Sequence, residues 1–223
     1  MEEWKKNFLK LLLEREVLRF GEFRLKSGRF SPYFFNLGKL SDGEALWRLG
    51  EAFARSILDL NIEIDYIHGP AYKGIPIASV TSACLWKNFK MKVRWGYDRK
   101  EMKNYGDIED KFIVGELLEG DSILLVDDVL TTGKTKLQNM EKLKMIGLNL
   151  EFKGILVAFD REERDEDGIC ASRRFEDEGI SFFSIFKARE VFHYLLSREI
   201  GGKIYVKDEL YEKFEKYMKR YGC

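Results

Sequence analysis

The stretch ILLVDDVLTTGKT, from Ile123 to Thr135, decides the fold class of this 223-residue chain. It begins with four apolar residues, as expected for a strand that is buried on both faces of a parallel sheet. Two acids and a turn rich in hydroxyl groups follow, and then a helical pattern with Leu137, Met140 and Leu143. A strand, a turn and a helix in this order are typical of one unit of an α/β sheet.

The same alternation extends in both directions from this stretch, over about residues 64–186. Two helices are predicted at 75–87 and 135–146, and five strands at 64–68, 92–95, 123–126, 154–159 and 181–186. Alternating strands and helices favour parallel neighbours joined by crossovers. We therefore expect an α/β fold with an open, mostly parallel five-stranded sheet and helices on both faces.

The two ends of the chain do not alternate. A helix over 4–18 and a β-hairpin with strands at 23–25 and 33–35 are predicted first, and two helices at 188–200 and 207–221 close the chain. Ser41 and Glu44, three residues apart, predict a capping box at the start of a helix. We expect a single domain over 1–223, in which 1–40 and 187–223 form a small hood on a core at 41–186.

Composition excludes several classes of protein. The chain has 38 Lys+Arg and 38 Asp+Glu, so its net charge is zero, which argues against a dedicated nucleic-acid binder. No stretch approaches the roughly 18 apolar residues of a membrane span, and the acidic start does not resemble a signal peptide. Cys84, Cys170 and Cys223 lie far apart and are expected to be reduced. These features together predict a soluble cytoplasmic protein.

The segment at the end of the buried strand carries the chemistry. Asp127 and Asp128 suit hydroxyl groups or a developing positive charge, and backbone N–H groups at the start of a helix suit phosphate. Gly133 lets the backbone approach an anion closely. Gly133-Lys134-Thr135 imitates the end of a nucleotide-binding P-loop, but that motif requires another glycine at the position of Asp128. The P-loop interpretation therefore fails.

These thirteen residues resemble the phosphoribosyl-diphosphate motif of the type I phosphoribosyltransferases. Further segments, in order along residues 17–161, narrow the resemblance to the orotate phosphoribosyltransferases. They are Phe20–Phe23, Leu25–Gly28, Ser31–Asn36, Gly69–Pro76, Arg99–Glu101 and Asp160–Arg161. The resemblance implies Mg²⁺-dependent transfer of ribose 5-phosphate from phosphoribosyl diphosphate to N1 of orotate. The product is orotidine 5′-phosphate, on the route to UMP, and diphosphate is released.

The resemblance also implies roles for individual residues. The catalytic positions are Lys103, Asp127, Asp128 and Arg99. Phosphoribosyl diphosphate is expected at Lys26, Tyr72, Lys73, Arg99, Lys100, Lys103, Tyr105, Asp127, Asp128, Val129, Leu130, Thr131, Thr132, Gly133, Lys134 and Thr135. Orotate is expected at Phe34, Phe35, Thr131 and Arg161, where a guanidinium can pair with its carboxylate.

Mg²⁺ is expected to bind through the diphosphate and the ribose rather than through a set of side chains. Tyr105 departs from the family, which commonly has histidine at this position. The resemblance further implies a homodimer with shared active sites, in which a charged loop containing Arg99, Lys100 and Lys103 reaches the partner's site. Two alternatives remain open: a non-catalytic regulator that senses phosphoribosyl diphosphate, and a phosphoribosyltransferase for another base.

Overall fold

A six-stranded sheet forms the centre of the protein, whose computed structural model describes residues 1–99, 112–130 and 133–223. The strand order is β5-β4-β3-β6-β7-β8. Five strands are parallel, which confirms the predicted sheet: β3 (Tyr66–His68), β4 (Arg94–Asp98), β6 (Ser122–Leu130), β7 (Glu151–Asp160) and β8 (Phe182–Lys187). The sixth strand, β5 (Ile113–Val114), pairs antiparallel with β4. Two residues are too few to show a period, so the sequence does not predict β5.

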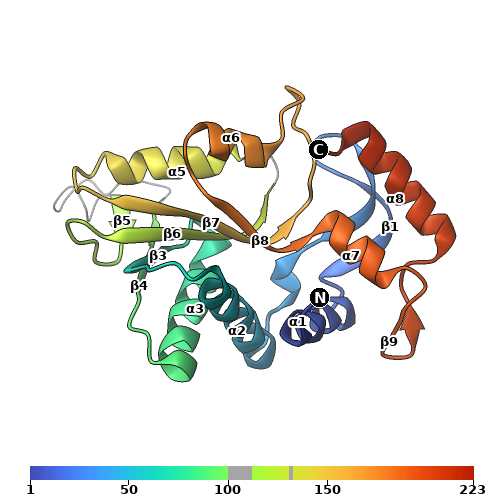
Figure 1. Cartoon of the computed structure of the whole chain (residues 1–223), viewed down its shortest axis with the longest axis horizontal. Helices are drawn as coiled ribbons and strands as arrows, with labels where there is room; N and C mark the ends of the chain where they lie inside the picture. The colour runs from blue at the N-terminus through green and yellow to red at the C-terminus, as the bar shows by residue number, and fades with distance from the viewer. Residues whose placement is uncertain (100–111, 131–132) are drawn as a thin grey trace.

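Helices cover both faces of the sheet (Figure 1). One face carries α2 (Gly43–Leu60) and α3 (Gly74–Phe89), and the other carries α5 (Lys134–Lys144) and α6 (Ala171–Asp177). Alternate residues of β6 enter the two layers, because successive side chains of a strand point to opposite faces. Val126 belongs to the core that contains α2 and α3, and Leu125 to the core that contains α5 and α6. Within the described part of the chain, no helix is long and apolar enough to cross a membrane.

The two ends of the chain pack against each other at one side of the sheet (Figure 1). The rings of Phe192 and Phe214 stack on each other, and that of Tyr33 lies 5.4 Å and 6.2 Å from them. The N-terminal elements are α1 (Glu3–Glu14), the antiparallel hairpin β1 (Leu18–Arg24) and β2 (Phe30–Phe35), and the 3-10 turn η1 (Leu37–Lys39). The C-terminal elements are α7 (Ala188–Leu195), the two-residue strands β9 (Glu199–Ile200) and β10 (Lys203–Ile204), and α8 (Asp208–Tyr221).

Several predicted boundaries are wrong. The helix at 4–18 ends at Glu14 and that at 188–200 ends at Leu195, because each is followed by the start of a hairpin strand. The predicted capping box does not form: Asp42 caps α2 instead, with its carboxylate accepting the Ala45 N–H at 2.9 Å. The strand predicted at 123–126 continues to Leu130, so both acids lie within β6 rather than just after the strand.

The prediction of three reduced cysteines is also wrong. Cys170 and Cys223 form a disulfide, with Cα atoms 5.8 Å apart, and of the described cysteines only Cys84 is free. The two cysteines are 53 residues apart in the sequence, so the sequence does not indicate that they are close in space. The end of the chain returns alongside residues 162–170, where the Cys223 N–H donates to the Glu162 carbonyl at 2.9 Å. The disulfide therefore ties the end of α8 to the segment that precedes α6.

We expect one titratable thiol per chain after denaturation without reductant, and three after reduction. Because the bond spans 53 residues, its removal should reduce the free energy of unfolding by about 2–4 kcal/mol. Chemical denaturation of Cys170→Ser, Cys223→Ser and the double variant measures this loss. The double variant should lose no more than either single variant. Three thiols in the unreduced protein would contradict the assignment.

Candidate active site

The carboxyl ends of three adjacent parallel strands, β3, β6 and β7, bring the predicted segments together. His68, the last residue of β3, is in register with Leu125, and Leu130 is in register with Asp160 at the end of β7. Arg161, the residue after Asp160, therefore lies beside the turn at the end of β6. Open α/β sheets bind ligands beyond the carboxyl ends of their strands, and the predicted residues lie at this edge.

The two adjacent acids face opposite sides of the sheet. Continuing the alternation of β6, Asp127 points toward the layer of α5 and Asp128 toward the layer of α3. Each carboxylate accepts the backbone N–H of the next residue at 2.8 Å. The two carboxylates thus lie on different sides of the sheet, and each requires a counter-charge on its own side.

A lysine meets each acid on its side of the sheet. Lys73 Nζ lies 2.5 Å from Asp128 Oδ2, and Lys136 Nζ lies 2.8 Å from Asp127 Oδ2. The Lys73 side chain is 56% exposed, whereas that of Lys136 is 10% exposed. Burial raises the pKa of Asp127; Lys136 opposes this rise and Asp128 adds to it. The predicted proximity of the acids to the Tyr72-Lys73 loop is present in the structure.

Gly133 begins the helix that follows the acids. Its φ is +74°, a conformation that favours glycine, and a Cβ there would lie 2.8 Å from the Phe175 ring of α6. Lys134 and Thr135 open α5, so their backbone N–H groups belong to the first helical turn, where the sequence predicts phosphate. Val129 and Leu130 are strand residues of β6. Thr131 and Thr132 lie outside the described residues.

The loop between β3 and α3 is held against β4. The Ala71 N–H donates to Asp98 Oδ1 at 2.9 Å, and the peptide bond from Ala71 to Tyr72 is cis. The resemblance implies a cis peptide without proline in this loop. Gly69 also approaches Gly74 closely, since a Cβ on Gly69 would lie 2.1 Å from the Gly74 carbonyl oxygen. Tyr72 is 67% exposed, so the loop presents it at the surface.

Phe34 and Phe35, the two residues predicted to flank orotate, differ in burial. Phe35 is buried and stacks on Phe159 at 4.9 Å, whereas Phe34 is half-buried and lies 5.6 Å from the Phe23 ring. Phe34 is thus the more exposed member of the pair, and the Arg19 guanidinium lies 5.4 Å from the centre of its ring. Lys26 is exposed in the turn between β1 and β2.

Arg161 is buried in a network that the sequence does not predict. Its Nε and Nη2 lie 2.9 Å and 2.7 Å from Glu163 Oε1, and Nη2 also donates to Ser31 Oγ at 3.1 Å. The guanidinium lies 4.4 Å from the centre of the Tyr33 ring. Glu163 therefore orients Arg161 beneath β2, the strand that carries Phe34. A buried arginine already paired in this way has part of its donor fork in use.

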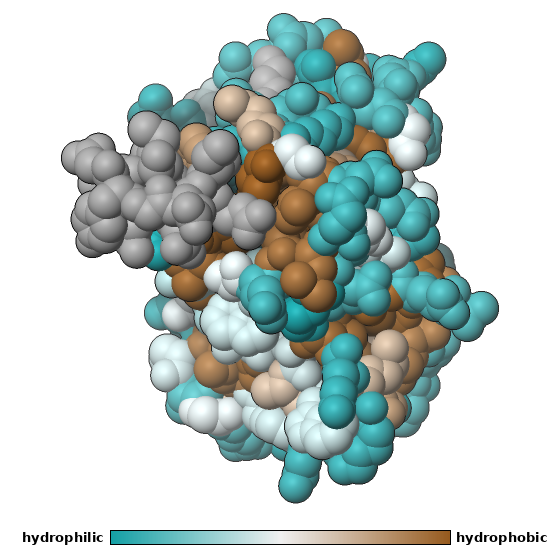
Figure 2. All heavy atoms as spheres, turned by 90° about the vertical axis from the view of Figure 1, so that its left-hand side faces the viewer, coloured by the Kyte–Doolittle hydropathy of each residue, from teal (hydrophilic) through white to brown (hydrophobic). Residues whose placement is uncertain are grey.

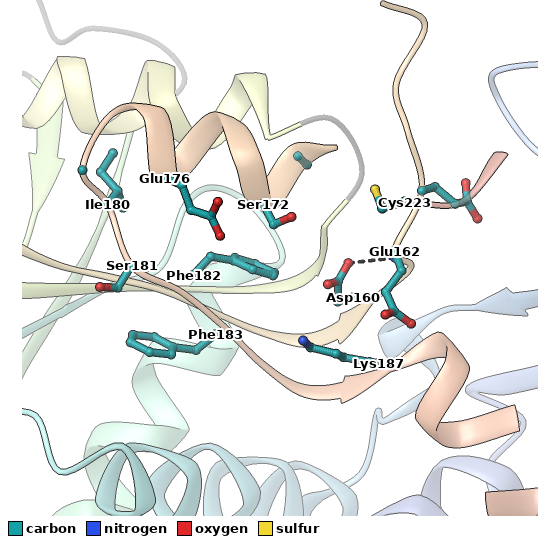
Figure 3. Close-up of a pocket in the computed structure, with 13 residues that line it drawn as sticks. Asp160, Glu162, Ser172, Glu176, Ile180, Ser181, Phe182, Phe183, Lys187 and Cys223 are labelled. Carbon is teal, nitrogen blue, oxygen red and sulfur yellow. Dashed lines mark hydrogen bonds between the residues drawn. The ribbon is translucent and has the colours of Figure 1, made fainter. Parts of the chain in front are cut away.

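A cavity of about 560 Å³ lies beside this segment, between α6 and β8 (Figure 3). Its charged lining includes Asp160, Glu162, Glu176 and Lys187. The Glu162 N–H donates to Asp160 Oδ1 at 2.8 Å, and burial raises the pKa of Asp160. Glu163, which pairs with Arg161, also lines this cavity, so the cavity borders the candidate active site.

The charged loop is largely outside the described structure. Lys100, Lys103 and Tyr105 fall among residues 100–111, whereas the N–H of Arg99 donates to the Phe112 carbonyl at 2.7 Å. Sequence reasoning also missed Lys136, although a signal was available. Lys136, Met140 and Leu143 are all buried at i, i+4 and i+7 of α5, so a lysine occupies a core-facing position. Such a lysine requires a buried acid as its partner.

The parallel sheet, the paired acids and the helix N-terminus at its carboxyl edge define an α/β protein whose candidate site offers groups that suit a phosphorylated, hydroxylated ligand. A family model described as "Phosphoribosyl transferase domain" matches residues 37–191. The orotate phosphoribosyltransferase of Colwellia psychrerythraea is 40% identical over 226 residues, covering all of both chains. The crystal structure of the Francisella tularensis orotate phosphoribosyltransferase has a TM-score of 0.83 and 32% identity, covering 97% of this chain and 100% of that one.

A Mycobacterium tuberculosis orotate phosphoribosyltransferase, in complex with 5-phospho-α-D-ribosyl 1-diphosphate, shares the fold at a TM-score of 0.61. Its identity is 18%, covering 84% of this chain and 98% of that one, so this likeness concerns the fold alone. The chain belongs to the phosphoribosyltransferase family and, within it, to the orotate phosphoribosyltransferases.

Proposed function

We propose that the protein transfers ribose 5-phosphate from phosphoribosyl diphosphate to N1 of orotate, a step of pyrimidine biosynthesis in the cytoplasm. The pairing of Asp128 with Lys73 carries this proposal, because it joins the acids of β6 to the loop expected to hold the diphosphate. The relatives named orotate phosphoribosyltransferase, which match 97–100% of the chain, support the choice of base.

The residues of the site suit the parts of this reaction. Amides at the start of α5 face the 5-phosphate, and the carboxylates of Asp127 and Asp128 face the ribose hydroxyls. When the bond from C1 to diphosphate breaks, its electron pair goes to the diphosphate, and orotate N1 bonds to C1 and releases its proton. Lys73 is exposed and can turn toward the leaving diphosphate, together with Arg99, Lys100 and Lys103 of the charged loop.

Mg²⁺ fits this site as part of the substrate. The described residues contain no group of three or more His, Cys, Asp and Glu side chains arranged to hold a metal, and both acids of β6 are paired with lysines. The ion is expected to arrive on the diphosphate and ribose oxygens, which are hard ligands that Mg²⁺ prefers. Bound there, it offsets the negative charge of the leaving diphosphate.

An assay of base specificity tests the proposed reaction. Supplied with phosphoribosyl diphosphate and Mg²⁺, the protein should convert orotate to orotidine 5′-phosphate and leave adenine, hypoxanthine and uracil largely unchanged. The measurement is product formation by chromatography for each base. Preferred use of a purine would reassign the base, and binding of phosphoribosyl diphosphate without turnover of any base would indicate the non-catalytic regulator.

Arg161→Ala should weaken the use of orotate far more than the binding of phosphoribosyl diphosphate. Loss of a charge-assisted pair with the orotate carboxylate costs about 2–4 kcal/mol, on the order of 30- to 1,000-fold in kcat/KM for orotate. Arg161→Lys should recover only part, since an ammonium lacks the planar fork. Steady-state kinetics with each substrate varied in turn measures both effects.

The pairing of Arg161 with Glu163 supplies the rival explanation for that experiment. If Arg161 acts only as the counter-ion of Glu163, Arg161→Ala lowers the melting temperature, because the buried carboxylate keeps only Arg29, 3.9 Å away, as an ion-pair partner. The kcat/KM of the folded variant for orotate then stays within a few-fold of the wild type. That result would remove Arg161 from orotate binding.

The proposal includes a homodimer with shared active sites. The charged loop supports it, together with large aromatic side chains that remain exposed: Trp86 of α3 is 50% exposed and Trp95 of β4 is 37% exposed. Figure 2 views the side of the molecule where β4 and β5 lie and shows apolar atoms among the hydrophilic ones. A second copy covering such residues would gain apolar burial.

Hybrid dimers should recover activity if the sites are shared. Lys103→Ala removes a loop cation, and Asp127→Asn/Asp128→Asn disables the ribose side of the site; each protein alone should be nearly inactive. After subunit exchange, about half of the dimers are hybrids, and each hybrid holds one intact site built from two chains. Activity of the mixture, with exchange verified by mass spectrometry, is the readout. No recovery would show that each chain completes its own site.

A further inference from the structure

The buried Lys136–Asp127 pair has no role in the family resemblance. Lys136 is 8% exposed, lies on the core-facing side of α5, and donates from Nζ to Asp127 Oδ2 at 2.8 Å. Asp127 uses its other oxygen to accept the Asp128 N–H at 2.8 Å. Both partners are therefore held in place, one by a strand and the other by a helix.

The second pair at this edge has a different character. Lys73 comes from a loop, and more than half of its side chain is exposed, so its ammonium can leave Asp128 and remain in water. The Asp128 carboxylate is only 7% exposed, so substrate hydroxyl groups must then take the place of the lysine. Lys136 cannot do the same, because an ammonium withdrawn from Asp127 would remain among apolar side chains such as Met140. The two acids consequently differ: the lysine of Asp128 is exchangeable and that of Asp127 is fixed.

We infer that Lys136 is a positioning residue that keeps Asp127 ionised for the ribose hydroxyls, while Asp128 is the acid that exchanges its lysine for substrate. The inference rests on the proposed function, whose site it divides into a fixed and an exchangeable half. Lys136 does not reach substrate in this scheme; it acts through Asp127.

The charged groups around Asp127 determine how the removal of Lys136 would affect its carboxylate. From α5 comes Lys136, from β6 the adjacent Asp128, and from the loop before α3 comes Lys73, which is paired with Asp128. Without Lys136, burial and the repulsion from Asp128 remain, and both favour a protonated Asp127. A protonated carboxyl loses acceptor capacity toward the ribose hydroxyls, so activity should fall on the acidic side of the pH profile.

Lys136→Met tests the inference, because methionine is of similar length and suits a buried position. The acidic limb of kcat/KM for phosphoribosyl diphosphate should move upward by about one pH unit or more, which corresponds to roughly a tenfold loss on that limb, and activity should recover at high pH. Lys136→Arg, which retains the cation, should keep the limb near its wild-type position. Lys144→Met removes an exposed lysine from the end of the same helix and is the matched control.

The outcomes separate the inference from the proposed function. A uniform loss of activity at every pH in Lys136→Met, with an unmoved acidic limb, would make Lys136 a structural residue and overturn the inference. If the wild type has no activity with orotate, the proposed reaction fails. In that case, calorimetric binding of phosphoribosyl diphosphate at pH 6 and pH 9 still tests Lys136. Affinity of the Met variant that is reduced at pH 6 and restored at pH 9 supports the inference, and equal losses at both pH values oppose it.

Discussion

Two adjacent carboxylates at the end of a buried strand need a cation on each face of the sheet, and much of the candidate active site follows from this requirement. The alternation of β6 sends Asp127 toward α5 and Asp128 toward the loop before α3. A single lysine between them could not serve both sides. The site therefore draws Lys136 from the helix that follows β6 and Lys73 from the loop that follows β3.

The order of the strands makes this arrangement possible. Because β3 lies directly beside β6, the loop at its carboxyl end reaches the acids without a long excursion. That loop is held at Ala71 by Asp98 from β4 on the other side of β3. Three neighbouring parallel strands thus supply the acids, the mobile cation and the anchor of the loop. The order of these groups along the carboxyl edge of the sheet matches a substrate that carries a ribose and a diphosphate.

Hydrophobic patterns in the sequence made most of the fold predictable, and the elements that were not predicted are too short to show such a pattern. The buried parallel strands are visible as short apolar runs and the major helices as apolar residues at helical spacing, whereas β5 and the hairpin strands β9 and β10 each have two residues. The pairing of Cys170 with Cys223 depends on where the chain ends in space, which no local pattern encodes.

Site residues divide in the same way. The acids and Lys73 belong to motifs with fixed spacing, and the fold brings them together as expected. Lys136 was missed because the periodic pattern of α5 was traced through its apolar residues alone, although a lysine on the same stripe was visible. Glu163 had no comparable signal: it lies in a run of charged residues that resembles solvated surface, and only the fold buries it under β2.

The end of the chain completes the surroundings of Arg161. Residues 162–164 form isolated bridges or hydrogen bonds with the last residues of the chain, from Tyr221 to Cys223, and Arg164 also bridges to Cys170. Glu163, which orients Arg161, therefore lies between β2 from the N-terminal hairpin and the end of α8. A guanidinium can be selective for a carboxylate only if its direction is fixed. The sheet supplies the acids and the helix start at which phosphate is expected, and the packed ends of the chain supply the fixed orientation of the arginine on which the choice of base depends in the proposed reaction.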